Sequence, residues 1–363
     1  CSDGVPSERL CYPLTAGRLV PMQTPRKHIY IAYTGGTIGM MPSPAGLTPQ
    51  PGMLEDKLRS MPEFTRKDMP EFTLHEYPTL LDSSDMSPQH WGIIAADILA
   101  NYAHYDGFVV LHGTDTMAYT ASALSFMLPD LGKPVIVTGS QIPLTALRSD
   151  GHDNLLNALY LAAYHPCAEV GLFFNHKLLR GNRSTKVNTS GFDAFDSPNS
   201  DPLFRVGIDV EPVLPPLRSL HSMQPEWQPV QNRAVAILTL YPGMDFSLAR
   251  HLLEQDLDGL IVQTYGAGNA PQQPEFMAAL HQACERNVVA VNHSQCLRGM
   301  VNMGGYAGGN ALRDCGLVSA VDMTLEATLT KLHVLLSRPG DRKTVADMAR
   351  RQMEKPLCGE LSL

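Results

Sequence analysis

The stretch that decides the architecture is His28-Ile-Tyr-Ile-Ala-Tyr33, followed by Thr34-Gly-Gly-Thr-Ile-Gly39. Its first half is a short apolar run of strand length, and the glycines behind it permit a tight bend. Comparable apolar runs recur at four later places: 72–77, 107–111, 134–137 and 170–174. Segments with helical spacing separate these runs. Strands joined by helices predict a mainly parallel sheet with helices on its faces.

The segments between the apolar runs carry helix-start signals. Ser87 and Pro88 precede an apolar period over 91–103, and Asp150 or Asp153 precedes a second one over 155–164. A small polar residue followed by proline is typical of a helix N-terminus. These signals support the alternation of strands and helices.

A change of pattern divides the chain. Between 206 and 232 prolines gather and the apolar period fades, as in a linker. Three apolar runs then alternate with three helical patterns. At 363 residues the chain also exceeds the roughly 250 to 300 residues at which one core stops growing. We therefore expect an α/β fold with a larger N-terminal domain at 22–205, a linker at 206–232 and a smaller C-terminal α/β domain at 233–363.

Residues 1–21 show no apolar period, and Met22 lies shortly ahead of the first strand. We interpret residues 1–21 as a non-native or disordered leader, with Met22 as the natural start. A lipoprotein anchored through Cys1 is the alternative.

Composition excludes several classes of function. Lys plus Arg total 28 against 36 Asp plus Glu, and the net charge of −8 has the wrong sign for binding nucleic acid. The longest apolar runs are far shorter than the ~20 residues of a membrane-spanning helix. Seven cysteines without a CxxC pair indicate a reducing compartment and offer no zinc spacing. We expect a soluble protein with no metal, nucleic acid or membrane partner.

Polar residues follow three of the predicted strands directly. They lie in 34–39, in Leu81-Asp-Ser-Ser-Asp85 and in Leu111-His-Gly-Thr-Asp-Thr116. The carboxyl ends of parallel strands meet at one edge of a sheet, where ligands bind. Carboxylates can bind an ammonium group, and hydroxyls a carboxylate, so the edge suits a small zwitterion. The alternative is that these residues form turns and helix caps, with His112 bracing a strand end.

Thr34-Gly-Gly-Thr-Ile38 and His112-Gly-Thr-Asp-Thr116 resemble the two signature segments of bacterial-type L-asparaginases. The resemblance extends from 26 to 361, and within the family the chain is similar to the cytoplasmic type I branch. Four further segments carry it: 82–86, 138–141, 180–186 and 265–269. It implies a two-domain cytoplasmic amidohydrolase that converts L-asparagine to aspartate and ammonia through an acyl-threonine intermediate, without a metal or organic cofactor.

The resemblance also implies roles for individual residues. Thr37 corresponds to the nucleophile, and a threonine hydroxyl needs activation to act as one. Thr114, Asp115 and Lys186 correspond to the family's Thr-Asp-Lys set. In that set Thr114 positions the water that hydrolyses the acyl-enzyme, and Lys186 assists proton movement.

Substrate binding is implied in the same way. Asp115 and Asp82 would hold the α-ammonium group, and Ser83 and Ser84 the α-carboxylate. Charge pairing at both ends of the substrate would fix its amide over the nucleophile. Backbone N–H groups near Gly36 would meet the oxyanion.

One position departs from the family pattern. Many relatives carry a tyrosine about ten residues after the nucleophile, on a lid, and this chain has Leu47 there. Leu47 can neither donate nor accept a proton. Three explanations are open: another tyrosine takes the place of the missing one, the lid is only a cover, or turnover is impaired. We favour substitution by Tyr306, whose alternative role is to anchor a glycine-rich loop.

Asn269 resembles a residue that neighbouring subunits contribute to each other's sites, which implies a homo-oligomer, a dimer of dimers. A helix cap explains Asn269 equally well. Thr185 and Cys296 match a regulatory asparagine site of some type I members. Gln263 lies where an arginine could bind the carboxylate of this regulatory asparagine. Because glutamine is uncharged, we do not expect cooperativity.

Three other functions compete with an asparaginase. A broad glutaminase-asparaginase differs by one methylene of substrate, which is worth only about 1 to 3 kcal/mol in a pocket. A subunit of a tRNA-dependent amidotransferase fits poorly with the acidic charge. A non-catalytic amino-acid sensor gains support from Leu47, but it would not need Thr37 together with Lys186.

Overall fold

The structure is a computed structural model that describes residues 26–44, 46–218, 220–221, 223–305 and 307–362. The leader expected at 1–21 therefore lies outside the described residues, as does Tyr306.

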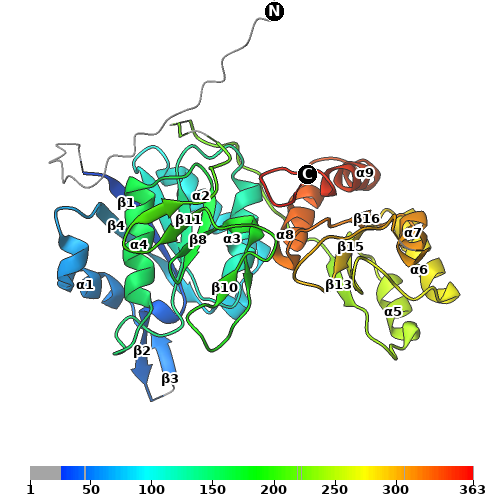
Figure 1. Ribbon diagram of the computed structural model, residues 1–363, viewed down its shortest axis with the longest axis horizontal. Coiled ribbons are helices and arrows are strands. Elements are labelled where there is room, and N and C mark those ends of the chain that lie inside the picture. Colours follow the sequence, from blue (N-terminus) through cyan, green and yellow to red (C-terminus); the bar gives the residue numbers. More distant parts are fainter. Residues whose placement is uncertain (1–25, 45, 219, 222, 306, 363) are drawn as a thin grey trace, which may run out of the picture.

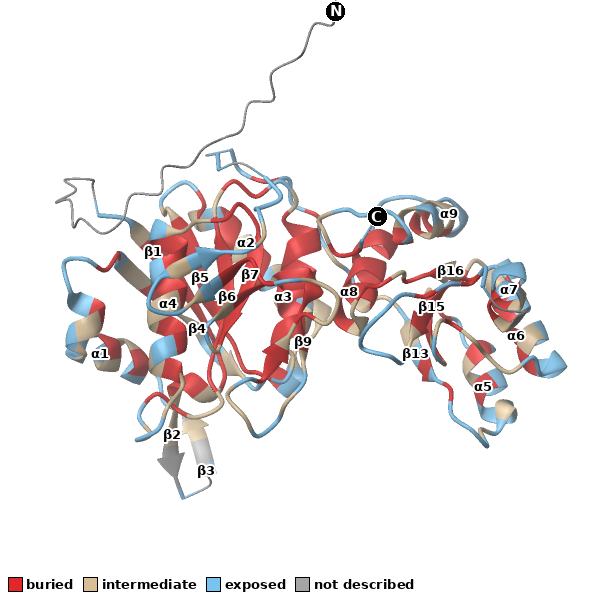
Figure 2. Cartoon of the chain, in the orientation of Figure 1, coloured by how far each residue is buried: buried red, intermediate tan, exposed pale blue. Residues whose placement is uncertain are grey.

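The described part of the larger domain is built on an eight-stranded sheet in the order β12-β11-β8-β7-β6-β5-β1-β4 (Figure 1). Its five parallel strands are β1 (His28–Gly35), β4 (Glu71–Leu81), β5 (Gly107–Leu111), β6 (Val135–Thr138) and β7 (Val170–Phe174). Three antiparallel strands complete one side: β8 (Lys177–Arg180), β11 (Phe204–Val206) and β12 (Val210–Pro212). Every residue of β5, β6 and β7 is buried, which explains why their sequences are continuous apolar runs (Figure 2).

Helices cover both faces of this sheet, because successive side chains of a strand point to opposite sides. Tyr30 and Ala32 of β1 pack in a core with α2 (Pro88–Asn101) and α3 (Met117–Met127). Ile29 and Ile31 pack on the other face, with α1 (Met53–Ser60) and α4 (Gly151–Tyr164). A hairpin of β2 (Met40–Ser43) and β3 (Gly46–Pro49) follows β1.

The smaller domain contains a parallel sheet in the order β13-β14-β15-β16. Its strands are β13 (Val235–Thr239), β14 (Gly259–Thr264), β15 (Val289–Ser294) and β16 (Val318–Ser319). The helices are α5 (Phe246–Leu253), α6 (Pro274–Glu285), α7 (Ala307–Asp314), α8 (Leu325–Leu336) and α9 (Arg342–Met353). Helix α8 lies between the two lobes in Figure 1 and packs against α3 of the first domain, so one core joins both domains.

The first sheet runs further along the chain than the sequence indicated. Strand β12 ends at Pro212, so residues 206–212 belong to this sheet and not to a linker. Further on, the backbone N–H of Gln228 donates to the carbonyl oxygen of Met127 at 2.8 Å. Two three-residue strands at a sheet edge carry too few apolar residues to show a period, which is why the sequence pattern ended early.

Two further observations concern partners. Among the described residues, no helix is long and apolar enough to cross a membrane. Within the same ranges, no group of three or more His, Cys, Asp or Glu residues could hold a metal ion.

Candidate active site

The ends of β1, β4 and β5 meet at one edge of the sheet, where glycines let the three segments come close. Gly36 has a φ of 91°, and a Cβ there would lie 2.4 Å from the backbone nitrogen of Gly113. A Cβ on Gly113 would in turn lie 2.5 Å from Oγ of Ser83. Only glycine fits both places. The backbone contacts therefore bring the three polar segments together, as the strand ends predicted.

Thr37 begins a 3₁₀ turn, Thr37–Gly39, directly after β1. Its neighbour Ile38 is buried and anchors the turn, while Thr37 itself is half-buried. Within the described residues the Thr37 hydroxyl has no hydrogen-bond partner. The turn is fixed from the strand side, because the buried hydroxyl of Thr34 donates to the carbonyl oxygen of Leu111 at 2.8 Å. A rigid support thus presents the Thr37 hydroxyl at this edge of the sheet.

Lys186, Thr114 and Asp115 form one hydrogen-bonded group. The Lys186 ammonium donates to Thr114 Oγ1 at 2.9 Å and to Asp115 Oδ1 at 2.7 Å. The Thr114 hydroxyl donates to Oε1 of Gln141 at 3.1 Å. Its proton and one lone pair are therefore committed, and the remaining lone pair is held in a fixed direction. Such a hydroxyl can orient a water molecule.

Gln141 is a site residue to which the sequence interpretation assigned no role. Its side-chain amide donates to the carbonyl oxygen of Gly191 at 3.1 Å, and the carboxylate of Asp150 accepts from its backbone N–H. Both bonds fix the amide that orients Thr114. The available signal was the segment Thr138-Gly-Ser-Gln141, which follows β6 at the same sheet edge.

Asp82 and the serines after it form a second part of the edge. Asp82 caps the 3₁₀ turn Ser83–Asp85, and its carboxylate accepts from the backbone N–H and the hydroxyl of Ser84, each at 2.9 Å. These hydrogen bonds hold the pKa of Asp82 below its usual range. Asp82 and Ser84 are exposed, whereas Ser83 is buried against Gly113.

The alternative interpretation of the polar residues at the strand ends as helix caps is partly wrong. Thr116 occupies the N-cap position of α3, but its hydroxyl donates to the carbonyl oxygen of Ser83 at 2.7 Å and does not cap the helix. Ser87 caps α2 in a reciprocal pair with His90. Thr116 therefore fastens two strand ends to each other.

His112 braces the end of β5, as the sequence interpretation favoured. Its Nδ1 donates to the carbonyl oxygen of Gly113 at 2.7 Å, and Nε2 pairs with the Thr120 hydroxyl at 2.8 Å. Burial lowers the pKa of His112 to about 4. The ring is therefore neutral at physiological pH and acts as a structural support.

Other predicted site residues have different partners. Asn269 exchanges backbone hydrogen bonds with Tyr265 in the turn after β14, and α6 begins only at Pro274, so its interpretation as a helix cap is wrong. The Thr185 hydroxyl donates to Glu326 Oε1 at 2.7 Å. Cys296 is exposed in the turn after β15.

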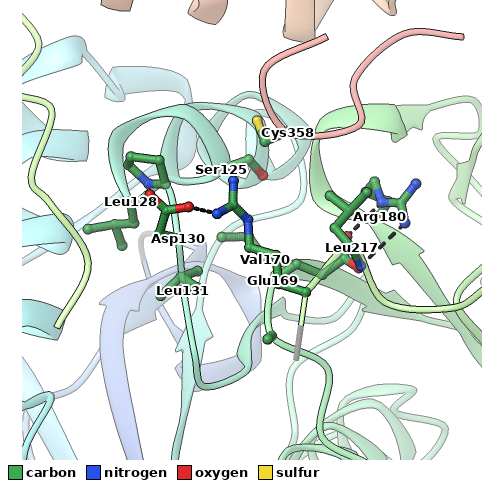
Figure 3. A pocket seen from close by; sticks show the side chains of 12 residues that line it. Ser125, Leu128, Asp130, Leu131, Glu169, Val170, Arg180, Leu217 and Cys358 are labelled. Carbon is green, nitrogen blue, oxygen red and sulfur yellow. Dashed lines mark hydrogen bonds and ion pairs between the residues drawn. The ribbon is translucent and has the colours of Figure 1, made fainter. Parts of the chain in front are cut away.

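A small pocket between the first domain and Cys358 of the C-terminal segment is not the candidate active site. Figure 3 shows it between Ser125, Cys358 and the ion pair of Arg180 with Glu169, whose Nε and Oε2 atoms are 2.6 Å apart. Its volume of about 20 Å³ holds one water molecule and no amino acid.

Comparison with known proteins agrees with this geometry. The family described as "Asparaginase, N-terminal" matches residues 28–217, and the "Glutaminase/Asparaginase C-terminal domain" matches 234–348. L-asparaginase 1 of Escherichia coli K12 is 54% identical over 93% of this chain and 98% of its own length.

Solved structures extend the similarity to the fold. L-asparaginase I from Vibrio cholerae has a TM-score of 0.84 at 53% identity, over 93% of this chain and all of that one. A protein described as probable cytoplasmic L-asparaginase from Campylobacter jejuni has a TM-score of 0.73 at 26% identity, over 89% of this chain and 99% of that one. The chain therefore belongs to the asparaginase family.

Proposed function

We propose that this protein is an L-asparaginase that hydrolyses the side-chain amide of L-asparagine to aspartate and ammonia, with Thr37 as nucleophile. The observation that carries the proposal is the group of Lys186, Thr114 and Asp115, which lies at the sheet edge that also carries Thr37. Acyl transfer needs a nucleophile, an oriented water and a path for protons, and these residues can provide each of them.

In the reaction that we propose, Thr37 Oγ1 bonds to the amide carbon, the C–N bond breaks, and ammonia leaves with the hydroxyl proton. Water then adds to the ester, the bond to Thr37 breaks, and aspartate is released while a proton returns to Thr37. Thr114 orients this water. Lys186 contacts the Thr114 hydroxyl, so protons can pass along the side chains. These groups provide the chemistry without a cofactor.

Charge supports the proposed orientation of substrate. Asp82 and Asp115 would bind the α-ammonium group, and Asp82, whose pKa lies below its usual range, is ionised at neutral pH. Ser83 and Ser84 would bind the α-carboxylate, for which the Ser84 hydroxyl must turn from Asp82 to the substrate. The N–H groups at the start of the Thr37 turn have no partner inside that turn and would meet the oxyanion.

We further propose a cytoplasmic homo-oligomer, a dimer of dimers, in which Asn269 completes the site of a neighbouring subunit. The similarity to the probable cytoplasmic L-asparaginase from Campylobacter jejuni supports the location. The Asn269 turn follows a strand of the smaller domain's sheet, whereas Thr37 follows a strand of the larger one. Tyr306 remains our proposal for the tyrosine missing at position 47.

The regulatory site at Thr185 and Cys296 has little support. The Thr185 hydroxyl is committed to Glu326, and the neutral amide of Gln263 accepts from Thr239 Oγ1 at 2.6 Å. We therefore expect a hyperbolic dependence of rate on asparagine concentration. A sigmoidal curve would contradict this expectation.

Ammonia release by Thr37→Ala tests the proposed function. We expect less than about one thousandth of the wild-type turnover, because removal of a nucleophile typically costs far more than this. Measurement of kcat/KM for asparagine and glutamine separates the broad glutaminase-asparaginase from the specific enzyme. Binding of aspartate without ammonia release from asparagine by the wild-type chain would instead favour the amino-acid sensor.

A further inference from the structure

Arg183 lies three residues before Lys186 in the 3₁₀ turn Gly181–Arg183, and its side chain is only 6% exposed. Its Nη2 donates to Asp322 Oδ2 at 3.1 Å and to Ser362 Oγ at 3.0 Å, while Nη1 donates to the carbonyl oxygen of Glu360 at 2.8 Å. One buried guanidinium of the first domain thus binds two separate segments of the second. We name Arg183, Asp322 and Ser362 the tail clamp.

The C-terminal segment of the clamp is itself firmly held. The Asp322 carboxylate accepts from the backbone N–H of Ser362 at 2.8 Å and from its hydroxyl at 2.7 Å. Burial raises the pKa of Asp322, but the bonds from Arg183 and Ser362 outweigh burial and hold the pKa below its usual range. Next to Ser362, the Glu360 carboxylate pairs with Lys331 of α8 at 2.6 Å, and both side chains are fully buried.

Other residues around Arg183 also bind the second domain. The Asn182 side chain donates to the carbonyl oxygen of Cys358 at 2.9 Å, and the Thr185 hydroxyl donates to Glu326 of α8. Lys186 comes next in the chain and is bound to the first domain at Thr114 and Asp115. Strand β9 (Thr185–Lys186) also pairs with β10 (Phe195–Asp196) of the first domain, and Arg183 Nη2 donates to the carbonyl oxygen of Asn199 at 3.0 Å. The lysine therefore extends from a support that both domains hold, and the C-terminal segment of the second domain ends beside α8 (Figure 1).

Backbone conformation next to Asp322 is unusual. Val321 has a φ of 56°, a region that β-branched residues rarely adopt. Two hydrogen bonds of the Val321 backbone hold this conformation. Its N–H donates to Ser319 Oγ at 2.9 Å, and its carbonyl oxygen accepts from the N–H of Val301 at 2.8 Å. Such strain costs about 1 to 3 kcal/mol and persists where the surroundings impose it.

We propose that Arg183 is a positioning residue that, through Asp322 and Ser362, fixes the strand of Lys186 and so places its ammonium on Thr114. This inference rests on the proposed function and deepens it. Lysine has four flexible side-chain torsions, so its tip is placed only as well as its backbone is held. A displacement of 1 Å at such a group costs about 100-fold in rate.

Two substitutions test the clamp. Asp322→Asn keeps the shape but removes the charge, and we expect kcat for asparagine to fall about 100-fold. Ser362→Ala removes two hydrogen bonds and keeps the Arg183–Asp322 ion pair, so it should fold in any case, with kcat about 10-fold lower. For both variants the fall in kcat should exceed any rise in KM, because among the proposed substrate-binding groups Asp115 contacts Lys186, whereas Asp82 and Ser83 follow another strand. Ser362→Thr restores the hydroxyl and should recover most of the turnover.

Glu169→Gln is the matched control. It breaks the ion pair with Arg180, which is almost as buried as that of Arg183 and lies at the pocket of Figure 3. We expect it to lower the melting temperature and to leave kcat unchanged. Wild-type protein without ammonia release would refute the proposed function. Two results with an active wild type would refute only the role of the tail clamp. One is a kcat of Ser362→Ala within twofold of the wild-type value, and the other is a kcat of Glu169→Gln that falls as much as that of Ser362→Ala.

Discussion

Replacement of Gly113 by alanine tests whether close backbone contact assembles the site. The new Cβ would lie 2.5 Å from Oγ and 2.7 Å from Cβ of Ser83, whereas carbon atoms in contact are about 3.5 to 4.0 Å apart. The segments must therefore separate by about 1 Å. Ser83 is buried and its carbonyl is bound by Thr116, so it cannot turn away. On the other side, Gly36 Cα lies 3.4 Å from the new Cβ.

Two measurements follow from this displacement. A shift of about 1 Å predicts a loss of about 100-fold in kcat/KM for asparagine, measured by ammonia release. Overpacking predicts a loss of about 1 to 3 kcal/mol in the free energy of unfolding. The control is Gly92→Ala in α2, where a Cβ meets nothing within 4 Å. It should stabilise the protein by about 0.5 to 1 kcal/mol and leave activity unchanged. If Gly113→Ala retained kcat/KM within threefold of wild type, close packing would not determine the site.

Three further predictions concern pH, a buried ion pair and subunit contact. His112 has a folded pKa of about 4 and an ordinary pKa of 6.5, so the unfolded chain binds the proton first and stability falls as the pH drops from 7 to 5. His112 should contribute about 2 kcal/mol of that fall, so the free energy of unfolding of His112→Gln, measured by chemical denaturation, should change less between pH 7 and pH 5 than that of the wild type. An equal change in both proteins would disprove this. Glu360→Gln leaves the Lys331 ammonium buried without its counter-charge and should cost about 3 to 5 kcal/mol in denaturant unfolding, so a loss below about 1 kcal/mol would count against it. If Asn269 acts across a two-fold interface, Asn269→Ala and Thr37→Ala chains refolded together in equal amounts should reach about a quarter of wild-type activity. The reason is that half of the dimers are then mixed, and each mixed dimer has one intact site of two. Activity equal to the mean of the two separate variants would refute a shared site.

Much of the architecture was predictable because its signals are local. The apolar runs at 107–111 and 170–174 coincide with β5 and β7, since strands buried on both faces need apolar residues at every position. Short edge strands such as β11 and β12 carry no such pattern. The boundary placed at 205 was therefore too early for the sheet.

The candidate site was predictable in its residues but not in its contacts. Position after a strand indicated that Thr37, Asp82 and Thr114 share a sheet edge, and the backbone contacts between their segments confirm that the segments converge. No local pattern could show that Gln141 orients Thr114. That bond joins residues 27 positions apart in the chain.

The sequence by itself determined the strand and helix pattern, the family resemblance and the choice of residues that we propose as reactive, because each depends on short segments. Only the tertiary structure decided which atoms meet: the Lys186 ammonium on Thr114, and Arg183 on Ser362, 179 residues away along the chain. The physical reason is that such contacts depend on how sheets and helices pack. A buried guanidinium must find acceptors wherever packing leaves them, since an unpaired buried charge is too costly.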